Sequence, residues 1–198
     1  PTEIELDVDL LTFIGLWIAD GCYDKNSIIM SVSSKEEQDL VNKIANRFKF
    51  STKIHSDNFS LMIHSGSLKY LLREILSLKG NAYTKRIPQW VFDLSLKQIG
   101  SVLKGLFSGD GHVSKKEIMM ALSSRKLLDD VQTLLLQFGI ILRIGKLRPD
   151  KTNNSTISTL RDWKLFKIHI GLLQEYKDNS LNLLCNKVST HCTSDIIP

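Results

Sequence analysis

Two short stretches of this chain share an apolar run that contains glycine and ends in an aspartate followed by a second glycine. FIGLWIADG (13–21) ends with Asp20, and LKGLFSGDG (103–111) ends with Asp110. Two carboxylates that lie together repel each other unless a proton or a cation lies between them. Oxygen ligands favour Mg²⁺, which keeps several waters and takes further ligands from a phosphate-bearing substrate. The pair therefore predicts metal-assisted phosphate chemistry, in which a cation readies a water and stabilises a leaving alkoxide. The alternative is that each aspartate only ends a buried helix.

Small residues in both stretches indicate how the two aspartates could meet. Gly15 and Ala19 lie four residues apart, as do Gly105 and Gly109. Small residues at this spacing occupy one face of a helix and allow two helix backbones to approach closely. We therefore expect a helix pair that places both aspartates at the same end.

The two stretches belong to an internal repeat, because Asp20 and Asp110 are 90 positions apart and other residues follow the same shift. These pairs include Gly15 and Gly105, Met30 and Met120, Asp39 and Asp129, Val41 and Val131, and Phe48 and Phe138. A match of this length without gaps indicates two copies of one structural unit. We assign residues 1–96 to the first half and residues 97–198 to the second.

The elements that must position the aspartates can be predicted from apolar periodicity and turn residues. In the first copy we expect a helix over 9–20, a strand over 27–34, a helix over 35–48, a hairpin turning at Asp57-Asn58, and a helix over 67–78. The second copy repeats this order, with a longer hairpin turn over 149–158. The order is helix, strand, helix, hairpin, helix, twice.

Composition places the chain among globular proteins. Of its 198 residues 42% are hydrophobic and 24% charged, which argues against disorder. The net charge of +5 is compatible with a polyanionic partner but is weak support alone. Three cysteines without metal-binding spacing favour a reducing, intracellular setting, and the apolar run over 10–19 is too short to span a bilayer. We expect a soluble protein.

With these features the chain resembles the LAGLIDADG homing endonucleases in their single-chain, two-motif form. FIGLWIADG is a close match to the motif and LKGLFSGDG a good one. The resemblance implies an α+β fold of two pseudo-symmetric αββαββα units, with saddle-shaped antiparallel sheets and a paired-helix interface. It also implies a monomer that cuts both strands of double-stranded DNA with Mg²⁺, or Mn²⁺ as a substitute, and leaves short 3′ overhangs. The metal ligands would come from Asp20, Asp110, Ala19 and Gly109.

The stretch NAYTKRIPQW (81–90) is similar to a segment that intein-encoded members carry before the second motif, and its Lys85 corresponds to a lysine that reaches the active site. In the second copy the strict shift gives Glu175, and the longer hairpin leads us to Lys187 instead. The ends of the chain also look intein-like but carry no splicing residues. We therefore expect an endonuclease region without a self-splicing domain, or one cut out of an intein.

We expect one face of each sheet to pack on helices and the other to meet DNA through alternating polar side chains. Met30, Val32, Ile54, Leu122, Ile144, Phe166 and Ile168 are predicted to point inward. The predicted DNA-binding residues are Ser31, Ser33, Lys53, His55, Ser123, Arg143, Lys167 and His169, with Lys146, Arg148, Arg161 and Lys164 adding charge on the long hairpin. Such a surface can neutralise phosphates and read base edges. For any one of these residues the alternative is an ordinary solvated sheet face.

Two other functions share this fold. One is an RNA-binding maturase that helps an intron to splice, and the other is a DNA-binding module whose catalysis has decayed. The presence of Asp20, Asp110 and Lys85 argues against decay, because lost activity relaxes the need for repelling carboxylates. Nothing in the sequence argues against an additional maturase function.

Overall fold

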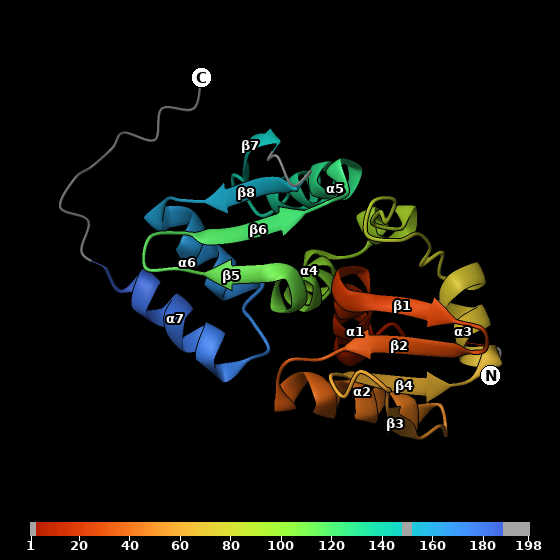
Figure 1. Ribbon diagram of the computed structural model, residues 1–198. Coiled ribbons are helices and arrows are strands. Elements are labelled where there is room, and N and C mark those ends of the chain that lie inside the picture. Colours follow the sequence, from red (N-terminus) through yellow and green to blue (C-terminus); the bar gives the residue numbers. More distant parts are fainter. Residues whose placement is uncertain (1–2, 148–151, 188–198) are drawn as a thin grey trace.

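The same order of elements occurs twice along the chain (Figure 1). This computed structural model describes residues 3–147 and 152–187. The first unit comprises α1 (Val8–Asp20), β1 (Gly21–Asp24), β2 (Ser27–Ser31), α2 (Lys35–Arg47), β3 (Thr52–Ile54), β4 (Ser60–His64) and α3 (Gly66–Tyr70). The second comprises α4 (Leu96–Asp110), β5 (Gly111–Val113), β6 (Ile118–Leu122), α5 (Arg125–Leu136), β7 (Arg143–Leu147), β8 (Asn153–Ile157) and α6 (Leu160–His169). A π-helical turn (Leu71–Ile75) continues α3, a 3₁₀ turn (Gln89–Asp93) precedes α4, and α7 (Glu175–Cys185) follows α6.

Each unit contains one four-stranded antiparallel sheet. The strand orders are β1-β2-β4-β3 and β5-β6-β8-β7, so the second sheet repeats the first strand for strand. The predicted α+β fold of two αββαββα units is confirmed. The predicted boundary between residues 96 and 97 falls at the start of α4.

Helix α1 is almost wholly buried, and both of its ends are fixed by local hydrogen bonds. The Asp7 side chain caps the helix by accepting from Leu10 N at 2.9 Å. Side chains from Leu10 to Ile18 are buried, which explains why the run is apolar on all sides. At the other end Gly21 N donates to Trp17 O, and the chain passes directly into β1. Asp20 therefore lies where helix and strand join.

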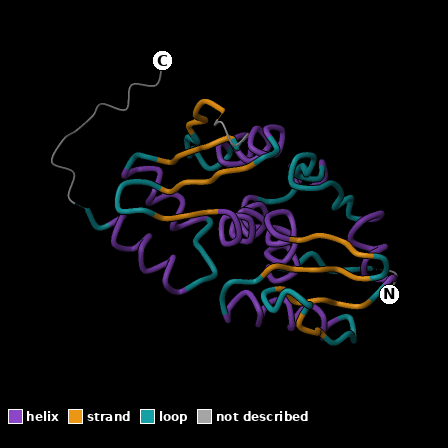
Figure 2. The backbone as a smooth tube through the Cα atoms, viewed as in Figure 1, coloured by secondary structure: helices purple, strands orange, loops and turns teal. Residues whose placement is uncertain are grey.

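Helices α1 and α4 pack together between the two sheets (Figure 1). Figure 2 shows this helix pair at the centre, with strands on either side of it. Because β1 starts where α1 ends and β5 starts where α4 ends, the aspartate ends of the pair lie beside both sheets. The fold thus brings two motifs that are far apart in sequence to one place.

The strand register assigns the side chains of each sheet to a covered face and an open face. Met30 and Leu61 are paired and buried, and they belong to the covered face. On the opposite face of the first sheet, successive partners form the row Cys22, Ile29, Met62 and Lys53. The matching row in the second sheet is His112, Met119, Thr156 and Arg143. We call the faces that carry these rows the open faces.

The second hairpin differs from the sequence prediction. The segment predicted as its turn contains strand β8, and the segment predicted to continue the sheet forms helix α6. The reason is that Trp163 and Phe166, three residues apart, both enter the core, where Phe166 packs edge-on against Phe107 at 4.9 Å. The Thr159 hydroxyl caps this helix by accepting from Asp162 N at 3.1 Å.

Two of the residues predicted to point inward, Ile168 and Ile54, are exposed instead. Ile168 lies on the exposed side of α6 and is 72% exposed. Ile54 is 71% exposed, because β3 is an edge strand and nothing covers its outer end among the described residues.

Within the described part of the chain, no helix has the length and apolar character needed to cross a membrane.

Candidate nucleic-acid interface and active site

The approach of α1 and α4 depends on two glycines. A Cβ added to Gly15 would lie 1.9 Å from Val102 O, and a Cβ added to Gly105 would lie 1.9 Å from Thr12 O. Real Cβ atoms never come so close to a carbonyl oxygen, so only glycine allows this separation of the helices. The two contacts are equivalent under the 90-residue shift, which makes the helix pair symmetric.

This packing brings the two aspartates together. A Cβ on Gly109, the residue before Asp110, would lie 2.5 Å from Ala19 Cβ and 2.8 Å from Asp20 Oδ2. The Asp20 carboxylate therefore lies against the backbone that carries Asp110. The structure thus brings Asp20, Asp110, Ala19 and Gly109 to one place.

Burial makes both carboxylates poor acids, and repulsion by Asp20 adds to the effect at Asp110. Burial, together with the nearby Asp20 charge, raises the pKa of Asp110 to about 7 against the opposing effect of Lys85 and Lys177. The pKa of Asp20 is also raised, again chiefly by burial, although one side of this residue is open to solvent. Two carboxylates that resist ionisation together are a favourable place for a cation.

The donor set fits a divalent cation that is bound through oxygen better than a metal that prefers nitrogen or sulfur ligands. The described residues contain no group of three or more His, Cys, Asp or Glu side chains that could hold a metal. With only Asp20 and Asp110 as charged ligands, the remaining oxygens would come from the backbone, water and a substrate. Mg²⁺ is bound in this way at phosphate-transfer sites.

Lys85 lies beside this pair in a fixed position. Its ammonium donates to Trp17 O at 3.0 Å, Ala19 O at 3.1 Å and Gly21 O at 2.7 Å. It also lies 4.8 Å from the centre of the Trp17 ring, and only 5% of the residue is exposed. Burial lowers its pKa, while Asp110 and Asp20 raise it. The C-terminal carbonyls of α1 thus hold a buried cation next to two carboxylates.

The structure does not bring Lys187 to the aspartates. Lys187 is exposed and donates to Lys115 O, beyond the far end of β5. Lys177 on α7 takes the expected place: it is buried and donates to Ser108 O, near the end of α4. Burial lowers its pKa, while Glu37, Asp20 and Asp110 raise it. Lys177 lies 92 residues after Lys85, so a strict shift of 90 misses it by two positions.

Only some of the predicted DNA-binding residues lie on the open faces. Lys53 and Arg143 occupy equivalent positions there and are exposed, and Ser31 is exposed beside Ser60. His55 lies in the turn after β3, where its ring is 3.1 Å from Asp57. Ser123 follows the end of β6.

Other predicted residues lie elsewhere. Ser33 follows the end of β2, and its backbone N–H and hydroxyl both donate to Glu37. Helix α6 carries Arg161, Lys164, Lys167 and His169, on the side of the sheet opposite the open face. Arg148 and the side chain of Lys146 lie outside the described residues.

Sequence reasoning missed several residues of the open face in the second sheet. Asn154 and Thr156 on β8 pair with Ala121 and Met119 on β6, and with Asp110 and His112 they line a hollow of about 360 Å³. The polar character of NNSTI (153–157) favours a turn in sequence, whereas in the structure its residues alternate between buried and half-buried, as in a strand.

Comparison with known proteins agrees with this geometry. Residues 97–171 match the family model described as a LAGLIDADG-like domain. The chain carries a LAGLIDADG-like domain. The LAGLIDADG fold extends over the first half as well, as solved structures show. The crystal structure of I-DmoI in complex with DNA and Ca matches 89% of this chain and 98% of its own, with a TM-score of 0.68 and 14% identity. The N-terminal LAGLIDADG domain of DUF199/WhiA matches 87% of each chain, with a TM-score of 0.61 and 18% identity.

Curated relatives match over only a small part of their own length. A glutamine–fructose-6-phosphate aminotransferase of Methanocaldococcus jannaschii is 28% identical over 91% of this chain but only 18% of its own. The DNA-directed RNA polymerase subunit Rpo1C of the same organism is 29% identical over 100% of this chain and 24% of its own. The chain thus spans less than a quarter of either relative.

Proposed function

We propose that this protein is a site-specific double-strand DNA endonuclease that hydrolyses phosphodiester bonds with Mg²⁺. The observation that supports this most strongly is the meeting of Asp20 and Asp110 at the ends of a glycine-packed helix pair, each beside a buried lysine. An aspartate that only ended a buried helix would need neither a second carboxylate nor a buried ammonium group beside it. Similarity to the homing endonuclease I-DmoI, solved in complex with DNA and Mn, supports the same function.

In this proposal the carboxylates of Asp20 and Asp110 would bind the cation, and the backbone oxygens of Ala19 and Gly109 would be the other ligands that the protein provides. When bound, Mg²⁺, or Mn²⁺ in its place, would supply a water of lowered pKa and charge to stabilise the leaving oxygen. Lys85 and Lys177 place positive charge where negative charge develops on the phosphates, in a site that excludes much of the solvent. Burial also lowers the pKa of both lysines, which makes each ammonium group readier to give up a proton than an exposed lysine.

The open faces would carry the DNA. Lys53 and Arg143 are equivalent exposed cations, one on each sheet, and each can neutralise a phosphate or bind guanine. The rows around them differ, with Cys22 and Ile29 in the first sheet and His112 and Met119 in the second. We therefore propose that the halves 1–96 and 97–198 read different half-sites of a long asymmetric target, and that one chain acts as a monomer. Cleavage would leave short 3′ overhangs.

The curated relatives suggest how such a protein is encoded. An aminotransferase and an RNA polymerase subunit have unrelated activities, so a segment that both share serves neither activity. We propose that the segment is a mobile element inserted in host genes, of the intein type.

The test is cleavage of a randomised duplex library with Mg²⁺, followed by sequencing of the cut ends and by a supercoiled-plasmid assay on the site found. Asp20→Asn and Asp110→Asn should each abolish or severely slow cleavage and leave binding in a gel-shift assay intact. Asp39→Asn, at an exposed position on α2, is the matched control and should cut at the wild-type rate. Wild-type cutting by Asp20→Asn would refute the proposal. Tight binding without any cutting would identify a DNA-binding module, and binding of structured RNA alone would identify a maturase.

A further inference from the structure

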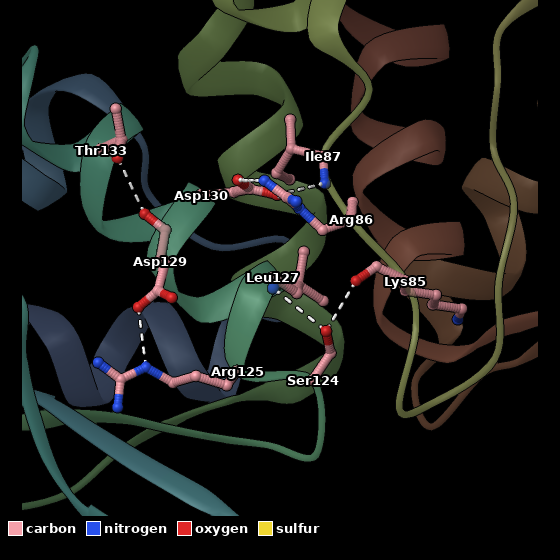
Figure 3. A network of polar contacts seen from close by, with 9 residues as sticks. All are labelled: Lys85, Arg86, Ile87, Ser124, Arg125, Leu127, Asp129, Asp130 and Thr133. Carbon is pink, nitrogen blue, oxygen red and sulfur yellow. Dashed lines mark hydrogen bonds and ion pairs between the residues drawn. The ribbon is translucent and has the colours of Figure 1, made fainter.

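The segment that carries Lys85 is held by a helix of the other half. Three consecutive residues contact α5 (Figure 3). Lys85 O accepts from the Ser124 hydroxyl at 2.8 Å, Arg86 forms two hydrogen bonds to the Asp130 carboxylate at 2.6 and 2.7 Å, and Ile87 N donates to Asp130 at 3.1 Å. The backbone from Lys85 O to Ile87 is therefore fixed from the second half, while the Lys85 ammonium lies on the end of α1 in the first half.

Asp130 is unusual among the carboxylates of this helix. It is 6% exposed and accepts three hydrogen bonds, all of them from Arg86 and Ile87. Its neighbour Asp129 is half exposed and pairs with Arg125 one turn earlier on the same helix (Figure 3). A buried carboxylate that binds a planar guanidinium through two bonds fixes both position and orientation, whereas an exposed pair within one helix contributes little.

Lys177 is held in the reciprocal way. Helix α7, which carries it, begins against the first turn of α2 in the first half. Glu175 N donates to Glu36 at 3.0 Å, and Gln174 Nε2 donates both to Glu37 at 2.6 Å and to Ser108 O at 2.8 Å. Ser108 O is also the acceptor of the Lys177 ammonium. Glu37 itself is 1% exposed, and Gln174 connects it to the oxygen that the lysine binds.

We propose that Asp130 and Glu37 are positioning residues, which set Lys85 and Lys177 in the site from the opposite half of the molecule. This inference rests on the proposed function for its catalytic consequence. Each half then presents its own DNA-binding face and also fixes the lysine of the other half. The two positioning residues are not equivalent under the shift, since Glu37 corresponds to Leu127 and Asp130 to Leu40. Because neither residue has an equivalent acid in the other half, a substitution of Asp130 or of Glu37 tests one lysine at a time.

The first test measures cleavage of the two strands separately. In the plasmid assay Asp130→Asn and Glu37→Gln should each slow one strand on the order of 10- to 100-fold, because a misplaced catalytic group loses rate steeply. Nicked plasmid should then accumulate, while the affinity for DNA stays unchanged. Asp129→Asn and Asp39→Asn, on the same helices, should behave as the wild type. Equal slowing of both strands, or unchanged rates, would overturn the proposal.

Non-additivity distinguishes positioning from general damage. If Asp130 acts through Lys85, Asp130→Asn should add no further loss to Lys85→Met, whereas independent effects would multiply. Thermal unfolding must show that each variant is folded at the assay temperature. Arg86→Gln, which removes the same ion pair from an exposed side chain, replaces Asp130→Asn if that variant does not fold.

A second readout needs no cleavage. Lysines of the folded protein are acylated with an N-hydroxysuccinimide acetate, and the extent at Lys85 is followed by mass spectrometry. Lys85 should be protected in the wild type and in Asp129→Asn, and at least several-fold more reactive in Asp130→Asn. Unchanged protection would refute the positioning role. If the wild type cuts no DNA, the proposed function fails, and this measurement still decides whether Asp130 positions Lys85.

Discussion

Replacement of Asp110 by asparagine should stabilise the metal-free protein above neutral pH, although it removes a residue of the site. The folded state raises the pKa of Asp110 from 3.8 to about 7, so the folded chain holds this proton more tightly than the unfolded chain. The free energy of unfolding must then fall as pH rises from about 4 to about 7 and stay level above that range. Below pH 4 the carboxyl is protonated in both states and contributes nothing.

The size of the effect follows from the shift. A rise of about three pKa units corresponds to a loss of at most about 4 kcal/mol in the free energy of unfolding once Asp110 is ionised. Because Asp110 is partly exposed, solvent screening lowers this energy, and we expect ionised Asp110 to destabilise the folded state by about 2 kcal/mol. The Asp110→Asn variant has no carboxylate to ionise. At pH 8 in EDTA its free energy of unfolding should therefore be about 2 kcal/mol higher than that of the wild type, and the difference should vanish near pH 4. Added Mg²⁺ should stabilise the wild type and reverse the order, since a ligand that binds only the folded state raises its stability.

Urea unfolding followed by circular dichroism, at pH 4 to 8 in EDTA and then in Mg²⁺, measures these differences. Asp39→Asn reports the generic effect of losing an exposed carboxylate. A wild type that gains stability over Asp110→Asn as pH rises in EDTA would show that the two aspartates do not destabilise each other.

Three other predictions concern the helix pair, the lysines and the DNA-binding faces. Gly15→Ala or Gly105→Ala should each lower the free energy of unfolding by about 1–3 kcal/mol, because the new methyl group meets a backbone oxygen. Gly66→Ala, with open space at its Cβ position, should change it by less than about 0.5 kcal/mol in the same urea titration. Lys85→Met and Lys177→Met should each slow cleavage on the order of 100-fold, with a larger loss on one strand than on the other. An equal loss on both strands would contradict the idea that each lysine serves the cleavage of one strand. DNA affinity, measured by fluorescence anisotropy, should fall at least about 1,000-fold between 50 and 200 mM salt, and a flat response would exclude the basic faces as the binding surface.

The repeat at a shift of 90 residues was enough to predict two copies of one unit and the meeting of Asp20 and Asp110. Periodicity missed the first strand of each unit, β1 and β5, and the complete αββαββα order came from the family resemblance. Steric rules for small residues and the alternation in short strands are local, so they can be read from sequence. The lysine of the second half could not be found in this way. Lys177 reaches the site because α7 docks against α2, which is a long-range contact. It also lies 92 residues after Lys85, so the repeat shift of 90 does not align the two lysines.

The same limit explains the error in the second hairpin. The alternation of Lys167 and His169 with Phe166 and Ile168 is compatible with a strand. The core selects a helix there, because Trp163 and Phe166 can enter it together only with helical spacing. Long-range packing thus overrides a short local pattern.

The contact between α1 and α4 has a consequence for protein engineering. Gly15 meets Val102 in the same way that Gly105 meets Thr12, so each half offers its neighbour the same self-complementary surface. A contact of this kind is what a two-fold symmetric homodimer uses. Either half, produced alone, is therefore expected to pair with a second copy of itself. Halves taken from different proteins with this glycine pattern could likewise be recombined into chimaeras that join two unrelated half-sites in one target.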